Sequence, residues 1–162
     1  MKTATWMGIV LCLCASAALA QSKIESGWAC PKATTANSID VGDQPHHSYM
    51  IAQFNCTSTK GEIDGVKEKE GTATEFAEVT GNRLKGHGIF VDTLANGDKI
   101  TFSYQSMATL KDGQMQSGSN KWQATGGSGK FKGIKASGGC KVMAGADGST
   151  NFDCSGTYTS PK

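Results

Sequence analysis

Four segments between Asp98 and Tyr158 have the composition of β-strands, and short turn-forming stretches separate them. The segments are Asp98–Tyr104, Lys121–Gly127, Lys135–Met143 and Thr150–Tyr158. In the first segment and its continuation, apolar residues alternate with polar ones, at Ile100, Phe102, Tyr104, Ala108 and Leu110. Such alternation places two side-chain sets on opposite faces of a strand. Long strands with tight turns predict an all-β fold, an antiparallel β-barrel of about eight strands.

Residues 1–20 have the pattern of a secretory signal peptide. Lys2 precedes a short apolar run, and Ala18-Leu-Ala20 is a small-x-small cleavage site. The apolar run is too short to span a membrane. We expect cleavage near Ala20 and a periplasmic or secreted protein. Residues 21–46 look irregular, and residues 47–162 are expected to form the barrel domain.

Four cysteines follow the leader: Cys30, Cys56, Cys140 and Cys154. An even number of cysteines in an exported chain indicates disulfides, and three pairings are possible. Cys140 and Cys154 flank the turn at Ala144–Gly148, and the midpoint between them, residue 147, falls inside this turn, so they should face each other across a hairpin. This favours Cys140–Cys154 together with Cys30–Cys56. A zinc site is the alternative, but no C-x-x-C pair is present.

The rest of the composition argues against several kinds of partner. A formal net charge of +2 does not indicate binding to nucleic acid. The mixed charges between Lys60 and Glu70 indicate a solvated loop or edge. A phosphate-binding loop ending at Lys130 would need glycine in place of Ala124 and a hydroxyl residue in place of Phe131. We therefore expect no bound cofactor, and a barrel corner at these glycines.

Metal binding and catalysis have weak support in the sequence. His46, His47 and His87 have no spacing that demands a metal, and we expect none. Carboxylates inside an apolar barrel could assist proton transfer, and the candidates are Glu75, Glu78 and Asp92. Surface carboxylates on strands are far commoner, so no catalytic residue is assigned.

Several segments together resemble the allene oxide cyclase-like barrel family, which includes plant cyclases, dirigent proteins and exported bacterial proteins. The segments are Gly88–Thr93, Asn96–Phe102, Ala108–Gly113 and Trp122–Ile134, and the most specific piece is Gly126–Gly133 followed by Ser137–Gly139. The resemblance covers roughly residues 71–158. It implies an eight-stranded antiparallel barrel with an apolar interior, in the exported bacterial branch of the family. It implies little about function, because chemistry depends on a few residues of a shared fold.

The sequence thus predicts an exported barrel that binds a small apolar or amphipathic ligand without catalysis. The expected lining is Phe54, Phe90, Phe102, Tyr104, Trp122 and Tyr158. Simple core packing by these side chains is the alternative, since eight-stranded barrels are often filled. Two further alternatives are an isomerase or cyclase, by analogy with the family, and a secreted module that binds proteins through its loops. The oligomeric state and the ligand are not determined by the sequence.

Overall fold

The computed structural model describes residues 21–145 and 148–160, which are almost entirely β-strand. The strands are β1 (Ser22–Cys30), β2 (Thr35–Asp40), β3 (His47–Lys60), β4 (Glu62–Ile63), β5 (Val66–Thr80), β6 (Arg83–Leu94), β7 (Lys99–Lys111), β8 (Gln114–Gly127), β9 (Lys135–Ala144) and β10 (Thr150–Thr159). A single 3₁₀ turn, η1 (Gly129–Phe131), joins β8 to β9. The proposed signal peptide lies outside the described residues.

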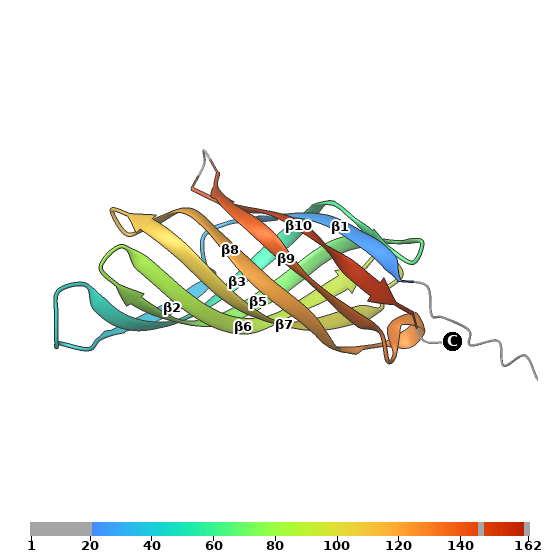
Figure 1. Ribbon diagram of the computed structural model, residues 1–162, viewed down its shortest axis with the longest axis horizontal. Helices are drawn as coiled ribbons and strands as arrows, with labels where there is room; N and C mark the ends of the chain where they lie inside the picture. Colours follow the sequence, from blue (N-terminus) through green and yellow to red (C-terminus); the bar gives the residue numbers. More distant parts are fainter. Residues whose placement is uncertain (1–20, 146–147, 161–162) are drawn as a thin grey trace, which may run out of the picture.

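Eight strands close into an antiparallel barrel in the order β1-β10-β9-β8-β7-β6-β5-β3, and β3 returns to β1. The long strands run obliquely around an elongated barrel, with η1 at one end (Figure 1). The two remaining strands are additions: β2 pairs along β3, and the short β4 pairs with β5. The predicted all-β barrel is confirmed.

The segment 21–46 is a correction to the sequence analysis, which expected it to be irregular. It contains β1 and β2, and β1 pairs along its whole length with β10, from Ser22 opposite Tyr158 to Cys30 opposite Thr150. The inward-facing residues of β1 include the polar Ser26, so apolar and polar residues do not alternate clearly along this strand. Pairing with a strand at the far end of the chain, rather than local composition, makes this segment extended.

Both predicted disulfides are confirmed, Cys30–Cys56 and Cys140–Cys154. Cys140 lies directly opposite Cys154 in the β9–β10 ladder, as the position of the turn implied. The four cysteines form a buried cluster with Trp28 on the inside of the barrel wall.

One end of the barrel is filled by a plug of apolar side chains. Phe131 of η1 is fully buried there, together with Ile63, Leu94 and Ile100. The glycine-rich segment thus forms the predicted corner, and Gly129 and Gly133 adopt positive φ values of 50° and 85°. Such backbone angles suit glycine because it has no Cβ to clash.

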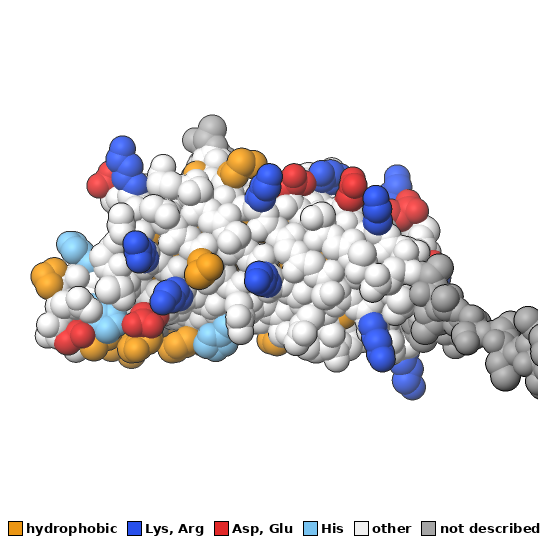
Figure 2. Space-filling view, in the orientation of Figure 1, with side chains coloured by type: hydrophobic (Ala, Val, Ile, Leu, Met, Phe, Trp, Pro, Cys, Tyr) orange, Lys and Arg blue, Asp and Glu red, His pale blue; other side chains and the backbone are white. Residues whose placement is uncertain are grey.

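The outer face carries exposed apolar side chains over β2, β3, β5 and β6. Tyr49 stacks on Phe76 with ring centroids 5.7 Å apart, and Phe76 in turn contacts His87 at 5.5 Å. Ile39, Ile51 and Ile89 are also exposed on these strands. Figure 2 shows hydrophobic side chains along one long edge of the molecule, close to histidines. In the described part of the chain, no helix is long and apolar enough to cross a membrane.

Candidate binding cavity

Beyond the plug, the barrel encloses a cavity of about 140 Å³. Its walls are the inward-facing side chains, which alternate with outward-facing ones along each strand. The aromatic part of the lining consists of Trp28, Phe54, Phe90, Phe102, Tyr104, Trp122 and Phe152. The interior is therefore filled at one end and hollow further along, which combines the two alternatives raised by the sequence.

Five of the six residues expected to line the interior do lie on the cavity wall: Phe54, Phe90, Phe102, Tyr104 and Trp122. They lie among close aromatic contacts. Phe102 meets Trp122 edge to face at 5.3 Å between ring centroids, and Phe90 meets Trp28 in the same way at 4.8 Å. Their part in ligand binding stays a prediction.

Tyr158 lies elsewhere, packed against the plug of the filled end. Its hydroxyl oxygen accepts a hydrogen bond from the backbone N–H of Asp64 at 3.0 Å. This bond ties β10 to the turn between β4 and β5, so the described geometry gives Tyr158 a structural contact. Period-two alternation assigns a residue to one face of a strand but does not say at which height of the barrel it lies.

Two glycines of β6 make room for polar side chains inside the barrel. A Cβ on Gly86 would lie 2.1 Å from Oε1 of Glu75, and one on Gly88 would lie 2.6 Å from the hydroxyl of Tyr104. No side chain fits at either position without displacing these groups.

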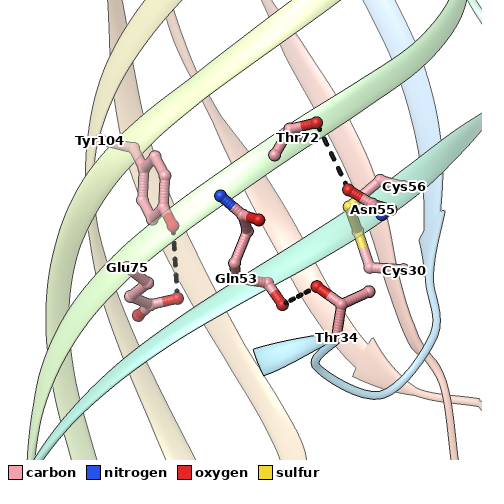
Figure 3. Close-up of a disulfide and its surroundings, with 8 residues drawn as sticks. All are labelled: Cys30, Thr34, Gln53, Asn55, Cys56, Thr72, Glu75 and Tyr104. Atoms are coloured by element: carbon pink, nitrogen blue, oxygen red, sulfur yellow. Dashed lines mark hydrogen bonds between the residues drawn. A yellow bond between two sulfur atoms is a disulfide. The ribbon is translucent and has the colours of Figure 1, made fainter. Parts of the chain in front are cut away.

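Glu75, Tyr104 and Ser106 form a hydrogen-bonded group on the cavity wall. The carboxylate of Glu75 accepts from Ser106 Oγ at 2.6 Å and from the Tyr104 hydroxyl at 3.4 Å. The Tyr104–Glu75 bond and the Cys30–Cys56 disulfide are seen together in Figure 3. Burial raises the pKa of Glu75, while its two hydroxyl donors and His87 oppose that rise. Burial and the nearby carboxylate raise the pKa of Tyr104, so its hydroxyl stays protonated and can donate.

Asn120 completes this polar level of the cavity on the neighbouring strand. It lies directly opposite Ser106 in the β7–β8 ladder. Its Oδ1 atom is buried and has no hydrogen-bond partner among the described residues. Glu75 is thus hydrogen-bonded to Ser106, Asn120 lies opposite Ser106, and all three line the cavity.

A second acidic group, Glu68 with Asp92, lies near the plug. The side chain of Asp92 is fully buried and that of Glu68 nearly so. Burial raises the pKa of both, and the neighbouring carboxyl raises that of Asp92 further. Two adjacent buried carboxyl groups cannot both be ionised without a cation, so one of them holds a proton. Glu68 reaches the cavity wall, beside the hydroxyl of Ser26.

The structure sorts the acidic residues differently from the sequence. Of the three named candidates, Glu75 and Asp92 point inward, whereas Glu78 contacts His47 at 3.0 Å on the outside. Glu68 was missed because it belongs to the mixed-charge stretch that was expected to be solvated. A register shift between Glu68 and Glu70 is the reason: the bulge reverses which residues face inward, and no local signal announces it.

The charge balance of the lining is one-sided. Two acidic residues line the cavity, and no lysine, arginine or histidine does so among the described residues. Residues 21–145 and 148–160 also contain no group of three side chains placed to hold a metal ion. The site can therefore offer an apolar, aromatic enclosure with hydrogen-bond acceptors at defined points.

Comparison with known proteins shows which proteins share this fold. Neither a protein-family model nor a curated protein matches the sequence. Among the solved structures that are similar are those of two dirigent proteins. The pterocarpan synthase dirigent protein PsPTS1 has a TM-score of 0.51 and 9% identity, over 88% of this chain and 97% of that one. The pterocarpan synthase dirigent protein GePTS1 has a TM-score of 0.52 and 10% identity, over 98% of this chain and 100% of that one. At this level of identity the likeness concerns the fold alone: the chain has the barrel fold of dirigent proteins.

Proposed function

We propose that this protein is an exported barrel that binds a small apolar or amphipathic molecule without transforming it. The observation that carries the proposal is the aromatic-lined cavity of about 140 Å³. A dry apolar cavity of roughly 150 Å³ can hold a molecule the size of benzene. The two disulfides support an oxidising compartment, where such bonds persist. We also propose that the protein belongs to the exported bacterial branch of the allene oxide cyclase-like family.

The test is ligand-dependent stability, with a variant that blocks the cavity. Toluene and other small aromatic probes should raise the Tm of the wild type and change its tryptophan emission, because Trp28 and Trp122 line the cavity. A ligand at about 100 times its Kd adds roughly 2.7 kcal/mol to the free energy of unfolding. Ala108→Phe, which fills the cavity from β7, should abolish both effects.

The matched control is Thr109→Phe, which adds the same ring to the exposed face of the same strand. It should bind the probes as the wild type does. Binding that survives in Ala108→Phe, or no binding to the wild type, would contradict the proposal. Native mass spectrometry of protein purified from its own host would then identify the natural ligand.

An isomerase or cyclase is a second candidate, favoured by the Glu75–Tyr104–Ser106 group in its apolar enclosure. Burial raises the pKa of the Glu75 carboxyl, which favours a role as a general acid or base. Turnover of a bound ligand that disappears in Glu75→Gln, with binding retained, would support it over simple binding.

A further inference from the structure

The polar level of the cavity has more hydrogen-bond acceptors than donors. The carboxylate of Glu75 accepts two hydroxyl hydrogen bonds, although it has about four acceptor positions. Oδ1 of Asn120, opposite Ser106, accepts none from the described residues. Buried acceptors that lack donors cost free energy, so this level is complementary to a ligand that brings N–H groups.

The charge of the cavity points the same way. Its acidic residues are Glu68 and Glu75, and no basic side chain lines it among the described residues. His87, which is not part of the lining, also acts on the charge of Glu75. The Glu68 residue is only 9% exposed, and its Oε2 has no hydrogen-bond partner among the described residues. A positive charge beside Glu75 would offset the burial that raises the pKa of that carboxyl.

The apolar walls suit the body of a cationic ligand. Phe102, Tyr104 and Trp122 line the same cavity as Glu75. Tyr104 bonds to Glu75 and lies opposite Trp122 in the ladder, and Phe102 meets the Trp122 ring edge to face. Aromatic faces attract a cation, by about 2 kcal/mol or more where water is excluded. The volume limits the body of the ligand to about one aromatic ring.

On the basis of the binding function above, we propose that the cavity selects a small ammonium compound with an apolar body. Its ammonium group donates hydrogen bonds to Glu75 and Asn120, and its apolar body lies among Phe102, Trp122 and their neighbours. The anionic counterpart of such a ligand is rejected, because its carboxylate would face Glu75 with no cation between them.

Three ligands of one shape test this selectivity: benzylammonium, toluene and benzoate, measured by calorimetry at neutral pH on the full chain. Benzylammonium should bind the wild type about tenfold or more tightly than toluene, a difference of 1.4 kcal/mol. Benzoate should bind more weakly than toluene. Binding of toluene without a preference for benzylammonium would overturn the ammonium proposal and leave the binding function intact. Failure of all three to bind would overturn both.

Variants assign the preference to the polar level. Glu75→Gln should weaken the binding of benzylammonium until its affinity equals that of toluene. The affinity of this variant for toluene should stay within about twofold of the wild-type value. Glu78→Gln is the matched control, because it removes a carboxylate from the outer face of the same strand, and it should keep the full preference. If Glu75→Gln does not fold, Asn120→Leu serves: it should weaken benzylammonium about tenfold while toluene is retained. A preference that survives in either folded variant of the cavity would overturn the assignment.

Discussion

Glu68 and Asp92 are two carboxyl groups buried next to each other inside an apolar barrel. Their burial has a cost that depends on pH, since only the neutral form avoids desolvation of a charge. Gly61, between β3 and β4, belongs to the same arrangement: a Cβ at this position would meet the Glu68 carboxylate, so this connection needs glycine to admit it. The pair is therefore built into the wall, and its protonation contributes to the stability of the whole fold.

The pair predicts that the barrel becomes less stable as pH rises from about 5 to about 8. Burial raises the pKa of Glu68 to about 7 and that of Asp92 to about 8, whereas in the unfolded chain both lie near 4. In this window the native state binds more protons, so the free energy of unfolding falls as pH rises. The loss should be at least about 1.4 kcal/mol, or roughly 3 °C in Tm. Thermal melts by circular dichroism measure it.

Asp92→Asn, which cannot ionise, should flatten this dependence and raise Tm at pH 8 relative to the wild type. Glu70→Gln is the control, because Glu70 is exposed on the same strand as Glu68. His47 contributes a pH dependence of stability with the same sign, because its hydrogen bond to Asp43 raises its pKa. The contribution of His47 should remain in both variants. A wild-type Tm that rises from pH 5 to pH 8 would refute the conclusion that one carboxyl of Glu68 and Asp92 holds a proton in the folded protein.

Among the elements, the corner from β8 through η1 to β9 is held by hydrogen bonds to the start of β7. Ser128 donates its backbone N–H to Lys99 O at 2.8 Å and its Oγ accepts from Lys99 N at 2.8 Å. Asp98 accepts from the backbone N–H of Lys130 at 3.1 Å. These bonds hold η1 against the start of β7, with Phe131 pointing into the plug.

Adjacent glycines at the end of β8 should respond very differently to substitution. A Cβ on Gly127 would lie 2.2 Å from the carbonyl oxygen of Phe131, which is backbone and cannot swing away. Gly127→Ala should therefore lower the free energy of unfolding by about 1–3 kcal/mol. Nothing lies within 4 Å of a Cβ on Gly126, so Gly126→Ala should change it by less than about 0.5 kcal/mol. Urea denaturation distinguishes them; equal effects would mean that the corner is not packed as described.

For the whole molecule, closure depends on the two ends of the described chain. Ser22 lies opposite Tyr158, and β1 is the strand that joins β10 to β3. The barrel therefore cannot close until its last strand is present. Because the pairing is between distant segments, slow folding is expected of such a topology.

Circular permutation tests this closure. A short Gly/Ser linker from residue 160 to residue 21, with new ends at the exposed turn between Asp112 and Gly113, should preserve the barrel. We expect a cooperative thermal transition and both native disulfides in the permutant. Deletion of residues 150–160 should abolish the transition, because β1 and β9 each lose a partner and Cys140 loses its disulfide. A truncated chain that still melts cooperatively would show that closure is dispensable.

Much of the barrel was predictable because its signals are local. The expected strand at 135–143 corresponds to β9 (Lys135–Ala144), and that at 150–158 to β10 (Thr150–Thr159). The other two were expected too short: β7 runs on to Lys111 and β8 begins at Gln114. The hairpin between β9 and β10 also determined the disulfide pairing, since a turn defines which residues lie opposite each other.

The site depended on tertiary structure for three physical reasons. Alternation separates two faces of a strand without saying which is inside, so Glu75 and Glu78 looked alike until β5 was placed in the wall. The bulge beside Glu68 reverses the alternation, and it arises from pairing with β6. Whether a barrel is hollow depends on the summed sizes of inward side chains from eight strands, including the glycines of β6, which no single segment encodes. The chain itself thus determined strands, turns and disulfides, and the closed barrel alone decided the cavity and the acids that face it.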